Sequence, residues 1–381
     1  MKVPFVDLKA QYASIKGEID YAIKSVIEDT AFIHGKYVKE FELAYAREYG
    51  VKHCIGVANG TDAIYISLKA LGIGQGDEVI TVANSWISTS ETITQAGARP
   101  VFVDIDPDYF TIDVDGIEQK ITSRTKAIIP VHLYGQSAEI DRIRRICEAR
   151  NLHLVEDCAQ AHFCTYRPNG SADDSADGAG QKVGTFGNVG TFSFFPGKNL
   201  GAYGDAGAIV TNDDDLAKRA RMYANHGSLI KHQHEIEGIN SRLDGLQAAI
   251  LSAKLRHIHD WTKRRQQNAL IYNQLLQDVE GIVTPKTRPN GSHVFHLYVV
   301  RARNRDGLQK YLKDQGIDTG VHYPAPLPFL KAYQYLRHVP EDFPVAHKYQ
   351  HEILSLPMYP EITREQIEYV VTHIKNFVGK L

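Results

Sequence analysis

The chain has 381 residues, of which 43% are hydrophobic and 23% are charged, so it is long enough for two or three domains and is neither disordered nor fibrous. Its 43 Lys and Arg residues against 45 Asp and Glu residues give a formal net charge of −2. This balance excludes the broad basic surface that non-specific nucleic-acid binding requires, so an anionic ligand would be bound by local groups.

The first thirty residues form the first expected unit, a helical N-terminal segment packed on a smaller C-terminal domain. Asp7 interrupts what would be the apolar region of a signal peptide. No run of apolar residues approaches the roughly 18 that a membrane span needs. We therefore expect a cytoplasmic protein that has neither a membrane nor a nucleic acid as partner.

Residues 31–245 predict a large α/β domain, because short β-branched runs alternate with helical patterns as in βαβ units. This pattern predicts a seven-stranded, mixed and mostly parallel sheet covered by helices. The expected helices include 61–72 and 138–151. The expected strands are 53–60, 77–84, 100–106, 125–135, 152–157, 190–196 and 206–212.

Residues 246–381 predict a smaller α+β domain, with the hinge in a helical region of one or two long helices at 243–276. A strand is expected at 293–300, and helices are expected at 306–316 and 364–378. The Gly-, Ser- and Asp-rich segment 167–182 predicts a mobile surface loop, either an inserted hairpin tip or a lid.

The four cysteines show no CxxC spacing, which fits a reducing compartment without a disulfide framework. His153, Cys158, His162 and Cys164 fall within twelve residues, and all are side chains that can bind zinc. Their spacing fits no standard zinc finger, and the first two belong to a predicted strand and its exit. We expect no metal.

Polar clusters that follow the strands are the candidate sites, since ligands of open α/β sheets bind at the carboxyl ends of the strands. The first is Asn59-Gly60-Thr61-Asp62, which ends a strand and opens a helix. Gly60 permits a tight turn, Thr61 can cap the helix, and the exposed N–H groups suit a phosphate. An ordinary capped turn is the alternative.

The second cluster is Glu156-Asp157, with Gln160 and His162 close behind. A carboxylate at the end of a buried strand is costly unless it meets a cation or a strong donor. The partner could be a structural arginine, a metal, a substrate or the protonated ring nitrogen of a cofactor.

The third cluster is the segment 193–201, in which Lys198 lies among aromatic, Pro and Gly residues. Desolvation there would lower the pKa of the amine and make it a candidate nucleophile for carbonyl groups, whereas an ordinary lysine is simply solvated. The segment is not a P-loop, and the spacing of Gly201, Gly204 and Gly207 is not that of a dinucleotide site.

The fourth cluster, 238–244, opens a long helix with Asn240 or Ser241 as its cap. The charged residues before it indicate a solvated loop, although Lys231 and the neighbouring histidines could bind a diphosphate.

Together these clusters resemble the DegT/DnrJ/EryC1/StrS group of sugar aminotransferases, which use pyridoxal 5′-phosphate on the aspartate-aminotransferase fold (fold type I). The resemblance is colinear over nearly the whole chain. It is carried by the segments 3–12, 59–64, 155–162, 193–209, 238–250 and 316–326.

The resemblance implies roles for individual residues around the cofactor ring. Lys198 would bind the cofactor's aldehyde covalently and then shuttle a proton. Asp157 would pair with the pyridinium nitrogen and keep the ring electron-poor. Gln160 would contact the ring hydroxyl, and Trp86 would stack on the ring face unless it is a core aromatic.

The cofactor phosphate would be held by Gly60, Thr61 and Ser193, joined by Asn240 from the other subunit of a homodimer with shared active sites. The resemblance thus implies that one site needs two chains.

The implied reaction is a two-step transamination in which L-glutamate gives its amino group to the cofactor, which passes it to a nucleotide-linked keto sugar. The favoured acceptor is dTDP-3-keto-6-deoxyhexose, in deoxyamino-sugar biosynthesis of the kind that supplies lipopolysaccharide O-antigen. Lys231, His322 and Tyr323 are the expected sugar-nucleotide contacts.

Several alternatives stay open at this stage. One is a UDP-linked 3-keto uronic acid as the acceptor, and another is a 4-keto-6-deoxy sugar. A cofactor-bound regulatory protein on the same fold is a non-enzymatic alternative. Dehydratase relatives carry His in place of the lysine, so Lys198 argues against that activity.

Overall fold

A seven-stranded mixed sheet lies at the centre of the larger part of the molecule, in a computed structural model that describes residues 1–168 and 180–379. Its strands are β1 (His53–Val57), β2 (Glu78–Val82), β3 (Arg99–Val103), β4 (Thr125–Ile129), β5 (His153–Asp157), β8 (Val189–Ser193) and β9 (Gly207–Thr211). Their order across the sheet is β1-β9-β8-β5-β4-β2-β3, and β9 alone runs antiparallel to its neighbours. The predicted sheet is confirmed, and the carboxyl ends of its parallel strands meet at one edge.

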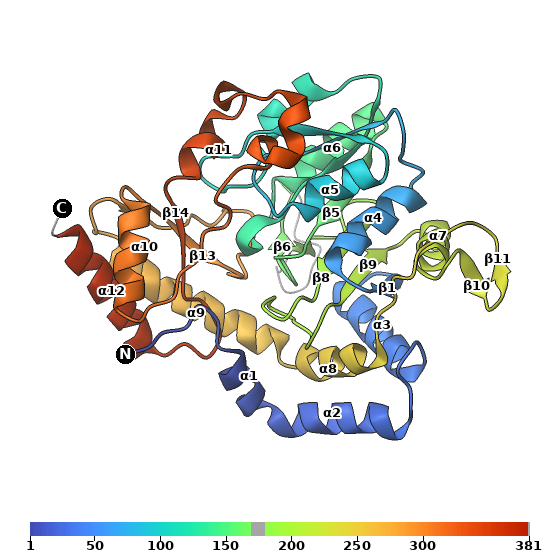
Figure 1. Cartoon of the computed structure of the whole chain (residues 1–381), viewed down its shortest axis with the longest axis horizontal. Coiled ribbons are helices and arrows are strands. Elements are labelled where there is room, and N and C mark those ends of the chain that lie inside the picture. Colours follow the sequence, from blue (N-terminus) through green and yellow to red (C-terminus); the bar gives the residue numbers. More distant parts are fainter. Residues whose placement is uncertain (169–179, 380–381) are drawn as a thin grey trace.

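Helices cover both faces of this sheet (Figure 1). They are α3 (Lys36–Tyr49), α4 (Gly60–Ala70), α5 (Ser88–Gln95), α6 (Ile140–Arg150), α7 (Asp214–Ala224) and α8 (Gly245–Leu255). One face packs on α4, α5 and α7 around Ile55, Ile64 and Ile209. The other packs on α3, α6 and α8 around Phe41 and Phe192. Burial on both faces explains why these strands are continuous apolar runs rather than alternating ones.

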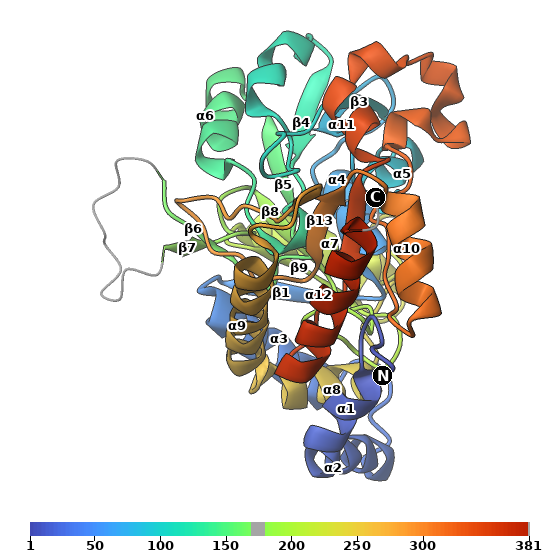
Figure 2. The ribbon, with the colours of Figure 1, turned by 90° about the vertical axis from the view of Figure 1, so that its left-hand side faces the viewer.

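A second, smaller core surrounds an antiparallel sheet of β12 (Ile282–Val283), β13 (Tyr298–Ala302) and β14 (Ile353–Leu356). It includes buried residues of α9 (Ile258–Leu276), α10 (Arg305–Asp314) and α12 (Arg364–Val378). Figure 2 shows these three helices together. The two helices predicted here are confirmed, and the long helical region before them is two helices, α8 and α9.

The strand predicted at 293–300 is only half right, since β13 begins at Tyr298. The N–H groups of Val294 and Leu297 donate to the carbonyls of Gly135 and Tyr134, at 2.8 and 3.2 Å. Tyr134 and Gly135 follow β4 of the large sheet in the chain. The chain from 293 to 297 therefore bonds to the larger part of the molecule instead of extending the small sheet.

The N-terminal segment forms two helices, α1 (Leu8–Ser14) and α2 (Lys16–Glu28), where one was expected. The residues before them pair with the smaller part, because the N–H of Val3 donates to Gly316 O and Val3 O accepts from the N–H of Asp318, both at 2.9 Å. Helix α2 packs instead on α8. The proposed boundaries at 30/31 and 245/246 stay predictions.

The remaining elements are short and were not predicted. They are β6 (Thr165–Tyr166), β7 (Gln181–Lys182), β10 (Ser228–Ile230), β11 (Gln233–His234), α11 (Pro344–Tyr349) and the 3₁₀ turns Val114–Gly116, Glu118–Lys120, Leu133–Gly135, Leu327–Phe329, Lys331–Leu336 and Pro340–Asp342. Most of the predicted loop 167–182 lies outside the described residues. Within the part of the chain that is described, no helix is both long enough and apolar enough to cross a membrane.

Candidate active site

The carboxylate of Asp157 lies at the carboxyl end of β5, and the residue is only 5% exposed. Its Oδ1 accepts a hydrogen bond from the N–H of Ala159 at 3.1 Å, and its Oδ2 accepts one from the hydroxyl of Thr89 at 2.8 Å. Burial raises the pKa of Asp157, while these two donors and the charge of Lys198 lower it. The carboxylate is therefore held in one orientation, ready to pair with a cation.

Two hydroxyl residues at the start of α5 support the site and were missed by the sequence analysis. Thr89 bonds Asp157, and Ser88 Oγ lies 2.7 Å from Thr61 Oγ1. The available signal was the hydroxyl-rich run 88–92, which follows β2 within a few residues, as the other polar clusters follow their strands.

Lys198 lies in the loop between β8 and β9. Its N–H donates to the Phe195 carbonyl at 2.8 Å, and the neighbouring Asn199 side chain donates to Val294 O at 3.0 Å. Burial lowers the pKa of the Lys198 amine to about 8, and the charge of Asp157 partly opposes that shift. Within the described residues the Nζ has no hydrogen bond or ion pair. The amine is thus available as a nucleophile near neutral pH.

The start of α4 meets the end of β8 at a very close approach. A Cβ on Gly60 would lie 2.6 Å from the Cβ of Ser193, so only glycine fits there. Asn59 caps the helix by accepting a hydrogen bond from the N–H of Asp62 at 2.8 Å. The structure brings Gly60, Thr61 and Ser193 together around a helix N-terminus, which favours an anion such as a phosphate.

Gln160 is already engaged by two protein groups. Its Oε1 accepts from the N–H of Tyr134 at 2.7 Å, and its Nε2 donates to the hydroxyl of Tyr323 at 3.0 Å. The Tyr323 ring lies 5.7 Å from the Trp86 ring, which is 59% exposed and so not a core aromatic. The expected ring contacts of Gln160 and Trp86 stay predictions, but both side chains lie with Tyr323 in one group.

His322 is the residue next to this group. Its Nδ1 lies 2.8 Å from Ser355 Oγ, and its ring stacks on Phe5 at 5.6 Å. Burial, helped by the charge of Lys198, lowers the pKa of His322 to about 4. The imidazole is therefore neutral at pH 7 and can take part in hydrogen bonds without adding charge.

Lys231 and Asn240 lie away from this group. Lys231 is exposed between β10 and β11, a hairpin that projects beside α7 (Figure 1). Asn240 is exposed too, and its backbone bridges to Asn225. Among the described residues of one chain, neither Lys231 nor Asn240 has a hydrogen bond or ion pair with Lys198.

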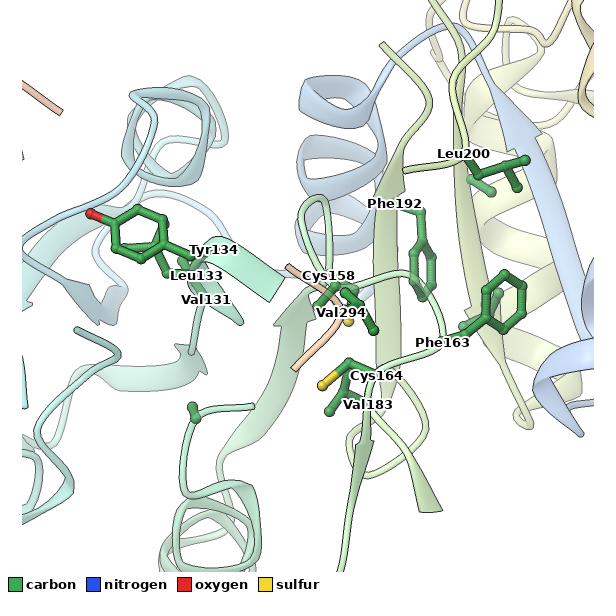
Figure 3. Packing of buried hydrophobic residues seen from close by; sticks show 14 of the residues in the cluster. Val131, Leu133, Tyr134, Cys158, Phe163, Cys164, Val183, Phe192, Leu200 and Val294 are labelled. Atoms are coloured by element: carbon green, nitrogen blue, oxygen red, sulfur yellow. The ribbon is translucent and has the colours of Figure 1, made fainter. Parts of the chain in front are cut away.

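The four residues singled out for zinc do not assemble into one cluster. Cys158 lies instead with His132 and Glu156, whose potential ligand atoms are within 4.8 Å of one another. The Glu156 carboxylate accepts from His132 Nε2 at 3.0 Å and from the backbone N–H groups of Gly184, Phe186 and Gly187 at 2.7 to 2.8 Å. Both oxygens of the Glu156 carboxylate therefore already accept hydrogen bonds from the protein. Figure 3 shows Cys158 and Cys164 among buried apolar side chains such as Val183 and Val294.

The donor set fits pyridoxal 5′-phosphate. The cradle at Gly60 and Ser193, which a Cβ would fill, suits its phosphate. The amine of Lys198 suits its aldehyde, and the buried carboxylate of Asp157 suits its protonated ring nitrogen. Each of the three groups has a matching partner at the same edge of the sheet.

The strand order, with an amine and a carboxylate at the carboxyl ends of neighbouring strands, is that of a fold-type I aminotransferase. The sequence model of the DegT/DnrJ/EryC1/StrS aminotransferase family matches residues 13–375, and the chain belongs to this family.

Two relatives match over almost their full length. A "pleiotropic regulatory protein" of Geobacillus stearothermophilus is 47% identical, with 99% of each chain covered. The dTDP-3-amino-3,6-dideoxy-alpha-D-galactopyranose transaminase of Aneurinibacillus thermoaerophilus is 43% identical, with 98% of this chain and 99% of the relative covered.

Two solved structures share the fold. DesV of S. venezuelae, in complex with a ketimine intermediate, is 40% identical with a TM-score of 0.94, covering 100% of this chain and 99% of DesV. NtdA of Bacillus subtilis, with the bound cofactor PMP, is 31% identical with a TM-score of 0.85, and the match covers 96% of this chain and 82% of NtdA. Pyridoxal 5′-phosphate and its amino form PMP are the cofactors of this family.

Proposed function

We propose that this aminotransferase moves an amino group from L-glutamate to C3 of a nucleotide-linked keto sugar, dTDP-3-keto-6-deoxyhexose. The observation that carries the proposal is the half-buried amine of Lys198, whose pKa is lowered by desolvation and acted on by the charge of the buried Asp157 carboxylate, at an edge that also offers a phosphate cradle. The dTDP-amino-sugar relative at 43% identity supports the sugar class.

The bound cofactor supplies an aldehyde that carries the amino group and a ring that withdraws electrons from the reacting carbon. Lys198 would hold that aldehyde and, as a free amine, would move a proton to and from the reacting carbon. Asp157 keeps its negative charge against the ring nitrogen, because Thr89 and Ala159 hold its oxygens in place. Gly60, Thr61 and Ser193 would hold the phosphate at the N-terminus of α4.

The sugar nucleotide is proposed to lie against His322 and Tyr323, with Lys231 at its diphosphate. Support comes from the position of Tyr323 between Gln160 and Trp86, next to the proposed cofactor ring. A neutral His322 suits hydrogen bonds to sugar hydroxyls, and an exposed Lys231 suits an anionic group.

We further propose a homodimer in which Asn240 and Lys231 serve the partner's site. Apolar side chains in and just after the β10–β11 hairpin are exposed, with Ile230 at 60%, Ile236 at 44% and Leu229 at 39%. Exposed apolar groups gathered in one place favour a protein partner. We place the reaction in the cytoplasm, in amino-sugar supply for a polymer such as O-antigen.

The decisive experiment incubates the purified holoenzyme with L-glutamate and a panel of dTDP-3-keto, dTDP-4-keto and UDP-3-keto sugars, followed by mass spectrometry. The expected product is a dTDP-3-amino sugar together with 2-oxoglutarate. Amination of a UDP-linked 3-keto uronic acid alone would replace the proposed acceptor, and amination of a 4-keto sugar alone would contradict the C3 assignment.

A regulatory role is the second candidate, since the relative at 47% identity is described as a pleiotropic regulatory protein. That role predicts a bound cofactor without amino transfer to any sugar in the panel. A half-reaction with L-glutamate that converts the bound cofactor to PMP, followed by turnover with a sugar, would contradict it.

A further inference from the structure

A fully buried lysine, Lys254, lies at the end of α8 outside the group of residues described above. The residue is 0% exposed, and its Nζ donates a hydrogen bond to the carbonyl of Gly201 at 2.7 Å. The Nζ also lies 4.2 Å from the centre of the Tyr203 ring. Both contacts are to the loop that carries Lys198.

This loop is closed on itself around Lys198. The N–H of Ala202 donates to the Phe194 carbonyl at 2.8 Å, so residues 194–202 form a ring with Lys198 near its middle. A Cβ on Gly201 would lie 2.4 Å from the carbonyl oxygen of Pro196, which shows how tightly the two sides of the loop approach. A shift of Gly201 would therefore move the residues beside Lys198.

Helix α8 holds the loop at a second point as well. The Gln247 side chain accepts a hydrogen bond from the N–H of Tyr203 at 2.8 Å. Gln247 and Lys254 lie seven residues apart, two turns along one face of the helix. The loop is thus bonded at two points to one rigid element.

An ammonium group at this position costs free energy, because burial disfavours its charge. The charge of Glu361 partly compensates, and both Glu361 carboxylate oxygens are buried without a hydrogen-bond partner in the described chain. An apolar side chain would avoid the cost but would leave the Gly201 carbonyl unpaired. The hydrogen bond to the Gly201 carbonyl is what the lysine supplies here and an apolar side chain cannot.

We propose that Lys254 is a positioning residue for Lys198, and that its bond to the Gly201 carbonyl fixes the closed loop in the conformation that presents the reactive amine. The inference rests on the proposed role of Lys198. It concerns no contact of Lys254 with cofactor or substrate.

The test compares three variants of the full-length holoenzyme. Lys254→Met keeps the length and apolar stem of the side chain but removes the donor. Lys254→Arg restores a cationic donor. Lys263→Met makes the same chemical change at an exposed position of α9 and serves as the matched control.

Two measurements respond to the conformation of the loop that carries Lys198 rather than to the overall fold. Visible circular dichroism of bound pyridoxal 5′-phosphate reports how the cofactor is held, and its dissociation constant is measured by absorbance titration of apoenzyme. We expect Lys254→Met to weaken the visible band and to raise the dissociation constant about tenfold or more, with far-ultraviolet dichroism unchanged. Lys254→Arg should recover part of both, and Lys263→Met should match the wild type.

A Lys254→Met holoenzyme with the visible band and dissociation constant of the wild type would overturn the proposal, as would an Arg variant no better than the Met variant. If Lys254→Met does not fold, Lys254→Gln decides: its shorter, neutral side chain fits the same space but ends too far from the Gly201 carbonyl to replace the ammonium, so both readouts should change in the same direction, and an unchanged variant contradicts the proposal.

Borohydride reduction of the wild type separates this inference from the proposed function. If reduction does not attach the cofactor to Lys198, the proposed role of that lysine fails. If it does, and the Lys254 variants behave as the wild type, only the present inference fails.

Discussion

Asp157 is buried and Lys198 is half-buried, and within the described residues neither forms an ion pair at hydrogen-bond distance. Each charge acts on the pKa of the other, which places them in one electrostatic environment. Desolvation makes the Lys198 amine easier to deprotonate, and it makes the Asp157 carboxylate a stronger partner for a cation.

Asp157→Asn is expected to reduce transamination about 10³-fold or more while the cofactor stays bound. The amide keeps the shape of the side chain and can still bond Ala159, but it no longer supplies the charge that holds the ring nitrogen protonated. Steady-state rates and the cofactor content by absorbance check this. Asp314→Asn, at an exposed helix end, is the control, and a mild effect at Asp157 would mean that its carboxylate is structural.

The pH dependence of cofactor binding tests Lys198 directly. Its pKa is lowered from the usual 10.5 to about 8. The amine is therefore mostly protonated below about pH 8 and mostly free above it. The rate at which apoenzyme recaptures pyridoxal 5′-phosphate should therefore rise with pH to a midpoint near 8. Because the Asp157 charge raises the pKa of this lysine, Asp157→Asn should move the midpoint to lower pH.

Stopped-flow absorbance between pH 6 and 11 measures that midpoint. A wild-type midpoint near 10.5 would show that the amine is solvated, and an upward shift in Asp157→Asn would contradict the proximity of the two groups.

Among the secondary-structure elements, the contact between the start of α4 and the end of β8 decides whether a phosphate site exists. Its side chains come from positions more than 130 residues apart, and Gly60 lets the two backbones approach. The glycine is needed here for the space of a Cβ rather than for an unusual backbone angle.

Gly60→Ala is expected to weaken the binding of pyridoxal 5′-phosphate about tenfold or more, since the new methyl group would displace Ser193 from the helix N-terminus. Binding of pyridoxal, which lacks the phosphate, should change much less. Absorbance titration of apoenzyme with both ligands makes the comparison.

Gly17→Ala is the matched control, because a Cβ there meets nothing within 4 Å and α2 should be unchanged or slightly more stable. Equal losses for pyridoxal and its phosphate in Gly60→Ala would show that the substitution disturbs the fold and not a phosphate site.

Most elements could be predicted from local pattern, and the exceptions have identifiable causes. Residues 293–297 have a strand-like sequence, but their N–H groups bond to the loop after β4. The helix expected at the N-terminus breaks at Ile15, whose φ of −129° leaves the helical region. Residues 293–297 are kept out of the small sheet by hydrogen bonds to residues distant in the sequence. The N-terminal helix is divided by the local backbone conformation of Ile15.

At the scale of the whole molecule, α8 and α9 link two hydrophobic cores. The buried residues of α8 belong to the core of the large sheet, whereas α9 contributes Ala269, Tyr272 and Leu276 to the smaller one. Lys198 lies in a loop that is held at two points, by Lys254 of α8 and by the Asn199–Val294 bond, and both partner segments pack in the core of the large sheet.

Mixed dimers test whether two chains build one site. Lys198→Ala and Asn240→Ala proteins, each impaired alone, are unfolded or dissociated together and reassembled. If Asn240 acts in the partner's site, each mixed dimer has one site with both native residues, and random assortment should restore about a quarter of the wild-type activity. Activity assays and sedimentation of the same samples give the measurement.

No recovery in samples that do contain mixed dimers would place Asn240 in its own chain's site or outside it. A wild-type protein that sediments as a monomer at assay concentration would contradict the shared site altogether.

The sequence alone determined the alternation of strands and helices, the seven strands, and the polar residues that follow them, because these depend on local periodicity and turn chemistry. It also indicated that Lys198 lies among aromatic, Pro and Gly residues and that Asp157 ends a buried strand. Only the tertiary structure decided that Thr89 orients Asp157, that Gly60 touches Ser193, and that Lys254 bonds the loop of Lys198. These contacts join residues 53 to 133 positions apart, and no local pattern encodes which distant side chain the folded core will bring into contact.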